Sequence, residues 1–434
     1  MNETICAVAT PLGTGGIGIV RISGPDAQRI GEQVFGRCPP PRRAAFGQFL
    51  DGNGEPIDSG IALYFAAPNS FTGEDVLELQ GHGGPVVLRL LCERVQELGA
   101  RLARPGEFTE RAFLNDRMDL AQAEAVADLI SATTAQAAKA SARSLTGEFS
   151  REILEIDKEV LDLRVFVEGA IDFAEEEIDF LTEESLVCRA DSICTRLQEL
   201  LRRTELGVSL QQGLQVVIAG APNVGKSSLL NALLDTERAI VTEVAGTTRD
   251  TLEGTIHLDG LPVHLTDTAG MHESDDPIEQ VGMNRAREAM DKADLVLWVV
   301  DDRETQGNST LPYEHFVVRN KCDMTNRPHG IVDDRTVRTS ATQGEGLDAL
   351  RQCLKQIAGF QPSDDAFAGR PRHVATLQNA LQSANRVVVE LKQKSGEVAA
   401  EELRSVHKCL GEVVGETTTD DLLGEIFSRF CIGK

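Results

Sequence analysis

The chain has 434 residues, of which 41% are hydrophobic and 26% charged, and this composition is ordinary for about two to four folded domains. Its 68 Asp and Glu outnumber its 43 Lys and Arg, which gives a formal net charge of −25. This charge excludes nucleic-acid binding through an overall basic surface, so any nucleic acid must bind to a local basic patch or through a partner protein. Nine scattered cysteines predict reduced thiols and no apolar run is long enough for a membrane span, so we expect a cytoplasmic protein without membrane contact.

The N-terminal segment alternates expected strands with an expected helix. Short runs rich in β-branched residues predict strands at Ile17–Ile22, Gly60–Ala66 and Val76–Leu79. Pro85–Leu98 predicts a helix, because Pro stands in its first turn and Gly99 follows its end. We expect an α/β or α+β domain over residues 1–118. The GTGGIG stretch at Gly13–Gly18 precedes a strand instead of a helix, so we interpret its glycines as a loop and a close strand approach, and not as a dinucleotide fingerprint.

The composition becomes helical near Asp119. From there to about Gly207, apolar residues recur at three- and four-residue spacing, which predicts two or three long helices. Helical patterns return at His373–Leu391 and Glu397–Leu410, after a segment in which strands and helices alternate. This order predicts an α/β domain over residues 211–371 that is inserted into a helical domain of residues 119–210 and 372–434.

The inserted segment carries a phosphate-binding loop. Gly220–Ser227 reads GAPNVGKS, between the expected strand LQVVIAG and the expected helix SLLNALL, which is the context that the G-x-x-x-x-G-K-S motif requires. The loop's backbone N–H groups can surround phosphates, Lys226 can contact the β- and γ-phosphates, and the Ser227 hydroxyl can bind Mg²⁺.

Further blocks predict that the nucleotide is a guanine nucleotide. Asp267–Gly270 (DTAG) follows a strand and can serve the Mg²⁺ shell and the γ-phosphate. Asn320–Asp323 (NKCD) follows another strand, and its last carboxylate can accept from both donors of guanine, with Ser340 and Ala341 supporting the base. Thr242–Asp250 (TEVAGTTRD) is interpreted as switch I. Met271 stands where small regulatory GTPases usually carry a water-orienting Gln, so the water must be arranged differently.

Two connections of this domain are short. Asp302–Pro312 separates two expected parallel strands, VLWVVD and EHFVV, and a crossover of that kind usually needs a dozen or more residues. We therefore expect its helix to be very short or missing. The stretch from Met324 to Val337 is likewise short for a helix plus a strand.

With these motifs, the whole chain resembles the MnmE/TrmE family, whose GTPases act in modification of the wobble uridine of tRNA. The family-specific stretches are ATPLGTGGIGIVRISGP, SFTGEDVLELQGHGGP, RPGEFTERAFLNDRMDLAQAEAVADLI and TTTDDLLGEIFSRFCIGK. The resemblance implies a multidomain α/β plus all-α fold: an N-terminal α/β domain that binds folate and forms a homodimer, a helical domain, and an inserted Ras-like P-loop GTPase domain.

The resemblance also implies cofactors and partners. AGTTRD together with PNVGKS is typical of the potassium-activated subgroup, so GTP or GDP, Mg²⁺ and K⁺ are expected. A flavin-dependent MnmG/GidA protein is the implied partner, in a heterotetramer that acts on tRNA. Together they would add an aminomethyl or carboxymethylaminomethyl group to C5 of the wobble uridine with the one-carbon unit of 5,10-methylenetetrahydrofolate, of which 5-formyltetrahydrofolate is an analogue.

Matching motifs carry the family's roles onto residues of this chain. Asn223, Thr242, Val244 and Thr247 would surround K⁺, Ser227 and Thr248 would hold Mg²⁺, and Glu279 would position the attacking water. Arg21, Glu78, Arg117 and Lys434 would bind folate, and Cys431 matches a tail cysteine with a proposed catalytic thiol. The full expected GTP site is Asn223, Val224, Gly225, Lys226, Ser227, Ser228, Thr242, Glu243, Val244, Ala245, Gly246, Thr247, Thr248, Asp267, Thr268, Ala269, Gly270, Asn320, Lys321, Asp323, Ser340 and Ala341.

A second hypothesis belongs to a different class. A regulatory GTP switch or assembly factor without any part in modification chemistry would need the same nucleotide motifs. It would not need the N-terminal motif set or the CIGK tail, and those two features favour the enzyme.

Overall fold

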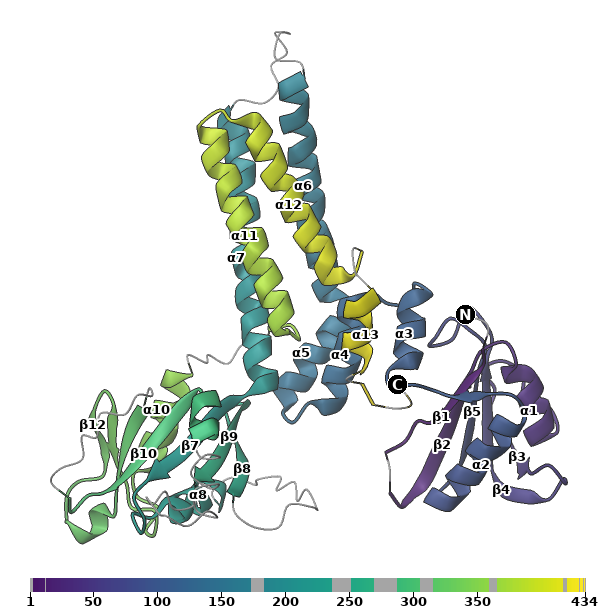
Figure 1. The fold of residues 1–434 in the computed structure, drawn as a ribbon, viewed down its shortest axis with the longest axis horizontal. Helices are drawn as coiled ribbons and strands as arrows, with labels where there is room; N and C mark the ends of the chain where they lie inside the picture. The colour runs from purple at the N-terminus through teal and green to yellow at the C-terminus, as the bar shows by residue number, and fades with distance from the viewer. Residues whose placement is uncertain are drawn as a thin grey trace. The chain divides into compact units, whose positions relative to one another are not determined.

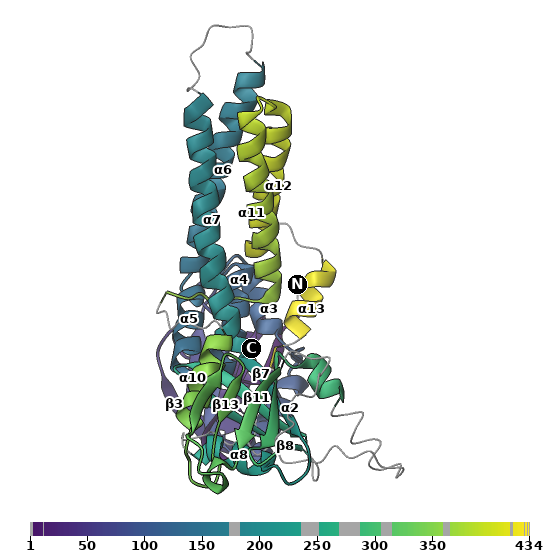
Figure 2. The same cartoon turned by 90° about the vertical axis from the view of Figure 1, so that its left-hand side faces the viewer.

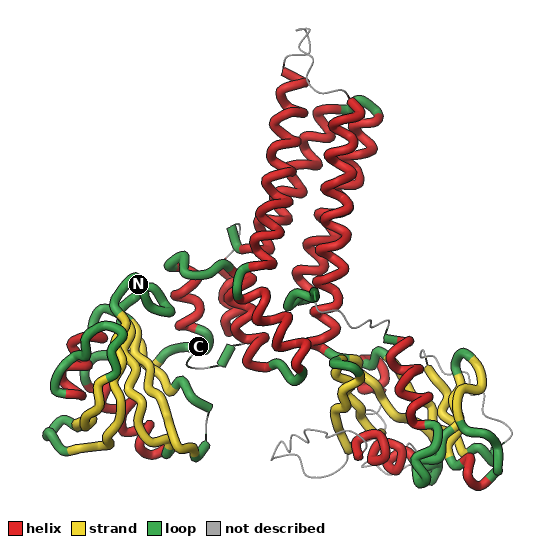
Figure 3. Tube along the Cα trace, turned by 180° about the vertical axis from the view of Figure 1, so that it is seen from behind, coloured by secondary structure: helices red, strands yellow, loops and turns green. Residues whose placement is uncertain are grey.

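The computed structural model describes residues 3–11, 13–172, 183–235, 251–268, 287–304, 315–358, 365–416, 420–428, 430, 431 and 433 (Figure 1). The chain forms two compact units: residues 1–131, 142–200 and 375–434 make the first, and residues 132–141 and 201–374 make the second. Figure 3 shows the strands gathered in two sheets. Among the described residues, one sheet has six strands and the other has seven.

The first sheet has the order β3-β4-β5-β2-β1-β6. Its strands are β1 (Ile5–Val8), β2 (Gly15–Ser23), β3 (Ala45–Leu50), β4 (Pro56–Phe65), β5 (Val76–Gly83) and β6 (Arg101–Leu102). Every pair is antiparallel except β1 with β6, so of the two expected arrangements the sheet matches α+β. The expected strands and the expected helix are confirmed, with β2 and β5 longer than their apolar runs.

Helices α1 (Ala27–Phe35) and α2 (Pro85–Glu97) share one core with this sheet. Alternation along β2 decides which side chains join it, because Val20 and Ile22 are buried while Arg21 points to the other face. Gly18 lies within β2, where a Cβ would collide with the Leu88 side chain of α2. The glycine-rich stretch therefore serves close packing of a strand, as its sequence context predicts.

The helical segment contains more elements than the sequence indicates. The described residues between 119 and 212 form four helices instead of two or three: α4 (Leu120–Ser131), α5 (Ala135–Leu145), α6 (Glu148–Asp172) and α7 (Glu183–Gln212). A single glycine explains one missed break, because Gly147, with φ 81°, separates α5 from α6. Helix α3 (Glu107–Leu114) precedes this segment. Three helices follow the second sheet: α11 (Pro371–Lys392), α12 (Gly396–Val414) and α13 (Asp420–Ser428).

Segments far apart in the sequence pair within this helical part. Helix α12 runs beside α6 (Figures 1 and 2), and Asp157 of α6 lies 2.7 Å from the His407 ring of α12. Two of the later helices were expected, and α13 was not. Its apolar residues pack with Leu120 and Ala123 of α4, so the end of the chain completes the core that the helical segment begins.

The second sheet has the order β12-β13-β11-β10-β7-β9-β8. Its strands are β7 (Leu214–Gly220), β8 (Thr251–Leu258), β9 (Leu261–Thr268), β10 (Leu295–Asp301), β11 (His315–Asn320), β12 (Gly330–Asp333) and β13 (Thr336–Arg338). The five central strands are parallel, and β12 and β8 are antiparallel edges. Helices α8 (Lys226–Asp235) and α10 (Leu347–Ile357) share a core with it.

One of the two short connections can be followed. After the 3₁₀ turn η1 (Cys322–Met324), residues 325–338 hold β12 and β13 and no helix, as their length predicts. The crossover between β10 and β11 includes residues 305–314, which lie outside the described residues, so the expectation of a short or missing helix there is not decided.

The two ends of the inserted segment lie against each other. Gly207 of α7 sits directly on the Phe367 carbonyl and Gly369 on the Thr204 carbonyl, at distances that leave no room for a Cβ. The Arg203 guanidinium stacks 4.1 Å from the centre of the Phe367 ring. The chain thus leaves α7 and returns toward α11 at neighbouring points.

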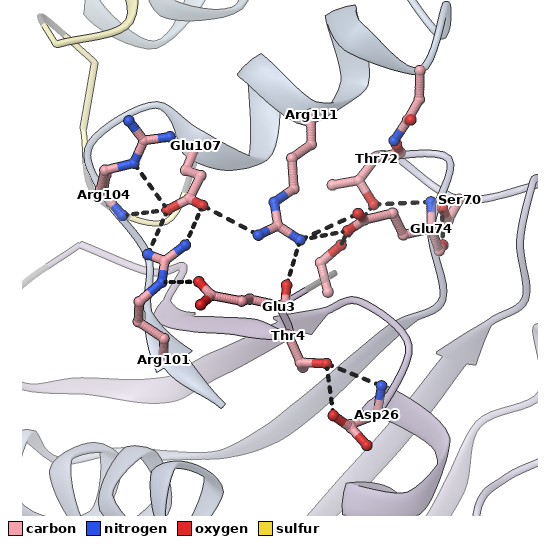
Figure 4. Close-up of polar contacts among 12 residues, drawn as sticks. Glu3, Thr4, Asp26, Ser70, Thr72, Glu74, Arg101, Arg104, Glu107 and Arg111 are labelled. Carbon is pink, nitrogen blue, oxygen red and sulfur yellow. Dashed lines mark hydrogen bonds and ion pairs between the residues drawn. The ribbon is translucent and has the colours of Figure 1, made fainter. Parts of the chain in front are cut away.

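A buried charge cluster fixes α3 to the start of β1 (Figure 4). Arg111 donates to the Glu3 carbonyl at 2.9 Å and to carboxylate oxygens of Glu74 at 2.9 Å and Glu107 at 3.2 Å. Burial would raise the pKa of Glu107, but hydrogen bonds from Arg101, the Arg104 N–H and Arg111 outweigh it and hold that pKa at about 2. The ionised carboxylate therefore stabilises the fold fully above its ordinary titration range, and this contribution is lost as the pH falls toward 2.

Replacing Arg111 by Met should destabilise the α3 region strongly, since it leaves the buried Glu107 carboxylate short of a partner. We expect a loss of about 3–5 kcal/mol, measured by hydrogen exchange of amides in β1 and α3 of the full chain. Arg104→Met is the control, because the Arg104 side chain is 61% exposed and its loss should cost about 1 kcal/mol or less. Equal protection in the two variants would contradict the assigned role.

Candidate functional site

The phosphate-binding loop lies between β7 and α8, as its motif predicts. The Lys226 ammonium is buried and donates to the carbonyls of Gly220 and Ala221, at 3.0 Å each. Burial lowers the pKa of Lys226, while the nearby Asp267 carboxylate acts in the opposite direction. A cation held among carbonyls of a glycine-bearing loop is well placed to bind phosphate oxygens.

Asp267, at the end of β9, faces the first turn of α8. Its Oδ2 accepts from the Ser227 hydroxyl at 2.6 Å, and its Oδ1 is buried without a hydrogen-bond partner among the described residues. A buried carboxylate oxygen with no partner is costly, and hard oxygen donors are the ligands that Mg²⁺ prefers. The pair therefore fits a Mg²⁺ site. The part of the chain that the structure describes holds no cluster of three His, Cys, Asp or Glu residues suited to a metal.

Asn320 joins three of the expected blocks. Its Nδ2 donates to the Val224 carbonyl of the phosphate loop at 2.9 Å, and its Oδ1 accepts from the Ala341 N–H at 3.1 Å. Gly225, with φ 96°, passes so close that a Cβ would collide with the Asn320 amide. The phosphate loop and the two blocks that are expected to read the base are thus held together by one side chain.

Lys321 and Asn223 form a second link between the same blocks. The Lys321 ammonium donates to the Asn223 carbonyl and to Asp301 Oδ2, the latter at 3.0 Å. Asn223 is exposed and takes the left-handed conformation with φ 61°. Asp323 lies exposed in η1, and the Cys322 N–H donates to the Thr339 carbonyl at 3.1 Å, beside Ser340. Lys321 therefore ties the loop of the expected guanine reader to the phosphate loop.

Three further expected nucleotide residues lie among the described residues: Val224 is buried, Ser228 is exposed in α8, and Thr268 ends β9. The expected switch I residues and the residues after β9 lie outside the described residues: Thr242, Glu243, Val244, Ala245, Gly246, Thr247, Thr248, Ala269, Gly270 and Glu279.

The first unit brings two expected folate residues together. Arg21 of β2 and Glu78 of β5 are paired in register, and Arg21 Nε donates to Glu78 Oε1 at 3.0 Å. Both side chains are about 15% exposed, and Gln80 Nε2 donates to the other Glu78 oxygen at 3.3 Å. Phe71 and Phe108 flank the Arg21 guanidinium, with ring centres at 5.7 and 5.8 Å.

The C-terminal tail reaches this pair. Arg21 also donates to the Gly433 carbonyl at 3.4 Å, and the Gly106 N–H donates to the Cys431 carbonyl at 3.4 Å. Cys431 is exposed, and Lys434 lies outside the described residues. Arg117 is exposed and lines a separate cleft of about 530 Å³ with Phe113 and Gly415; no described contact joins it to Arg21 or Glu78.

Sequence reasoning missed four residues of this pair's surroundings: Phe71, Phe108, Gln80 and Gly433. Gln80 could have been found, because it stands two positions after Glu78 in an expected strand and so shares its face. The two aromatic residues come from a loop and from α3, and only the tertiary fold brings them to Arg21.

The sheet orders, the phosphate loop and the helical segment define the class: a multidomain protein that contains a P-loop GTPase domain. Family models agree along the chain, with "GTP-binding protein TrmE N-terminus" matching residues 4–117 and "MnmE helical domain" matching residues 120–431. The chain belongs to the MnmE/TrmE family.

Relatives support this membership over the full length. The chain is 49% identical over 452 residues to the tRNA modification GTPase MnmE of Pseudomonas syringae pv. syringae, covering 100% of this chain and 99% of that protein. It is 50% identical over 453 residues to the protein of the same name from Pseudomonas paraeruginosa, with the same coverage. Among solved structures, the G domain of the T. maritima FeoB iron transporter is 26% identical, covers 33% of this chain and 98% of that one, and has a TM-score of 0.27.

Replacing Asp323 by Asn should weaken GTP binding, because a double acceptor becomes a mixed group facing the two donors of guanine. We expect a loss of about 2–4 kcal/mol, measured by calorimetry. Asp348→Asn is the matched control, since that carboxylate lies on α10 of the same domain and its side chain is 96% exposed. Unchanged GTP affinity in Asp323→Asn would contradict the base-reading role of NKCD.

Proposed function

We propose that this chain is a potassium-activated GTPase that works with a flavin-dependent partner on C5 of the wobble uridine of tRNA. The coarser function rests on family membership: the chain is a GTP hydrolase of tRNA modification, and it uses GTP or GDP and Mg²⁺. The observation that carries the nucleotide part is the Asn320 bridge, which holds the phosphate loop and the base-reading blocks in one arrangement.

The proposed division of labour in the nucleotide site follows from chemistry. Lys226 binds phosphate oxygens, and Ser227 holds Mg²⁺ with Asp267 beside it. A divalent cation there neutralises charge that develops between the β- and γ-phosphates. Thr248 and Glu279, proposed for Mg²⁺ and for the attacking water, lie outside the described residues.

Potassium is proposed as the second cation. Asn223 offers a side-chain amide oxygen and lies in the phosphate loop, with its own backbone carbonyl held by Lys321. Together with Thr242, Val244 and Thr247 it would supply oxygen ligands to a cation that takes the place of an arginine finger. The lack of a Gln at Met271 supports a different way of arranging the hydrolysis.

Folate binding is proposed for the Arg21–Glu78 face of the first sheet. A guanidinium suits a folate carboxylate, and a carboxylate suits the amino-pyrimidine edge of a pterin. The Cys431 tail lies at the same place through Gly433, which supports a role of the tail near the one-carbon unit. Arg117 and Lys434 are kept as proposed contacts, and a catalytic role of the Cys431 thiol is part of the proposal.

A homodimer through the N-terminal domain is supported by exposed apolar residues on the same sheet face. Phe46 and Ile61 are register partners on β3 and β4, and they are 75% and 37% exposed. An exposed apolar pair of this kind on the face away from α1 and α2 suits a second copy.

The MnmG/GidA partner, the heterotetramer and the domain bounds 1–118, 119–210 with 372–434, and 211–371 remain proposals from the sequence. The same holds for the cytoplasmic location; no helix of the described residues is long and apolar enough to cross a membrane.

Arg21→Ala should lower affinity for 5-formyltetrahydrofolate by at least about tenfold, since a hydrogen bond to a charged group contributes about 1.5–3 kcal/mol. Calorimetry on the full chain measures it. Arg29→Ala removes an exposed arginine of α1 that pairs with Asp26, and it should bind folate like the unchanged chain. Full affinity in Arg21→Ala would count against the site; folate binding itself would favour the enzyme over a pure GTP switch.

GTP hydrolysis should be at least about tenfold faster in potassium than in sodium buffer, which corresponds to roughly 1.4 kcal/mol in the barrier. The smaller Na⁺ fills the proposed oxygen cage poorly. Asn223→Ala should remove this difference and leave GDP binding largely intact.

The matched control for this prediction is Asn231→Ala, on an exposed position of α8, which should keep the potassium response. The measurement is the single-turnover rate of GTP hydrolysis in potassium and in sodium buffer, at saturating GTP and Mg²⁺. Equal rates in the two salts would refute the cation mechanism and would direct attention to Arg249 of switch I.

A further inference from the structure

A second cluster of buried charge lies behind the base-reading block, and the nucleotide site does not use it. Asp302, directly after β10, is 0% exposed. Its Oδ1 lies 3.0 Å from Arg338 Nε, and the NH1 atoms of Arg327 and Arg319 follow at 3.7 and 3.8 Å. Three guanidinium groups thus converge on one buried carboxylate.

The three arginines come together because of the sheet topology. Arg319 on β11 and Arg338 on β13 are register partners of a parallel pair, so their side chains share a face. Arg327 follows η1 and reaches the same carboxylate. Together with Val317 and Thr336 they line a cavity of about 350 Å³.

Most donors of these guanidinium groups remain available. Besides Asp302 Oδ1, Arg319 donates to the Glu304 carbonyl, Arg327 to the Asp302 carbonyl and Arg338 to the Pro328 carbonyl, at 3.2–3.4 Å. Each guanidinium carries five N–H donors, and within the described ranges none of the three NH2 groups has an acceptor. The cavity thus offers a converging set of charged donors.

We propose that this cavity binds a small phosphate-type oxyanion. Planar guanidinium forks match the oxygens of phosphoryl groups, and several forks on one wall can share one dianion. Two exposed carboxylates, Glu304 and Asp333, also line the cavity. These carboxylates repel an RNA strand, which must bring a row of phosphates past them, more than a single phosphoryl group, which needs to reach only the three arginines.

Occupancy of this cavity acts on the nucleotide site through Asp302. The Thr325 hydroxyl donates to Asp302 Oδ2 at 2.6 Å, and the Asp302 N–H donates to the Asn320 carbonyl at 2.8 Å. Asp302 therefore contacts the first residue of the base-reading block through its backbone N–H, and the chain just after this block through its carboxylate. An anion that competes with Asp302 for the arginines changes the support of that loop, and GDP dissociation should change with it.

The test uses the full chain saturated with GDP and Mg²⁺, so that the phosphate loop is filled, and titrates pyrophosphate and inorganic phosphate by calorimetry. Arg338→Gln should weaken pyrophosphate binding at least fivefold. Asp302→Asn should tighten it severalfold, because the internal competitor is removed while the shape is kept. Lys355→Gln, a surface charge loss on α10 of the same domain, should leave it within twofold.

The opposite signs of the two variants separate a binding site from a merely structural cluster. Absence of pyrophosphate binding to the unchanged chain overturns the proposal, and so does binding that Arg338→Gln and Asp302→Asn leave unaltered. A short RNA that binds where pyrophosphate does not also overturns it. Thermal unfolding and circular dichroism check that each variant is folded. If Arg338→Gln is not folded, Arg319→Gln and Arg338→Lys replace it, and the lysine variant should bind pyrophosphate more tightly than the glutamine variant.

Discussion

A charged side chain that leaves water must find a partner, and three places in this chain are built around that requirement. Arg111 and Glu107 of α3 form an ion pair with each other. Lys226 donates to carbonyls of its own loop beside Asp267, and Asp302 lies close to three arginines. In each case the buried group fixes a backbone segment that could otherwise move. The positions of α3, of the phosphate loop and of the base-reading loop follow from these pairings.

The three buried charged groups differ in how many of their polar atoms have hydrogen-bond partners, and this difference distinguishes a structural cluster from a ligand site. Glu107 receives donors on both oxygens, so its carboxylate is satisfied, although Arg111 Nε in the same cluster is buried without a partner among the described residues. Asp267 keeps one oxygen without a partner among the described residues, and the arginines around Asp302 keep donors. A carboxylate whose two oxygens both accept hydrogen bonds adds rigidity, whereas a carboxylate oxygen without a partner, or a guanidinium donor that faces a cavity, can contact a ligand. By this criterion the first supports the fold and the other two are places for a cation and an anion.

Apolar runs and short motifs in the sequence predicted the helices and strands that depend on neighbouring residues alone. The strand before Gly220 and the helix after Lys226 follow from an apolar run and a motif, and both are present in the structure. The number of helices in the described residues between 119 and 212 was underestimated, in part because a single glycine at residue 147 separates α5 from α6. The Arg21–Glu78 pair came from a resemblance, while Phe71 and Phe108 beside it depend on tertiary contacts that no sequence period carries. Family membership and GTPase activity are confirmed, and the switch I residues remain a prediction.

The close contact of residues 203–207 with residues 365–369 has a consequence for how the helical domain is assembled. Helices α11 to α13 are synthesised only after the whole inserted segment, and joining them to α6 and α4 closes a loop of that length. For a disordered chain of about 160 residues the length-dependent entropy of closure is roughly 4–5 kcal/mol. A folded insert whose two ends already meet removes most of this cost. The folded GTPase domain thus keeps the two ends of the inserted segment together for the helices that precede and follow it in the sequence. Mutations that unfold the core of the GTPase domain should therefore also destabilise these helices.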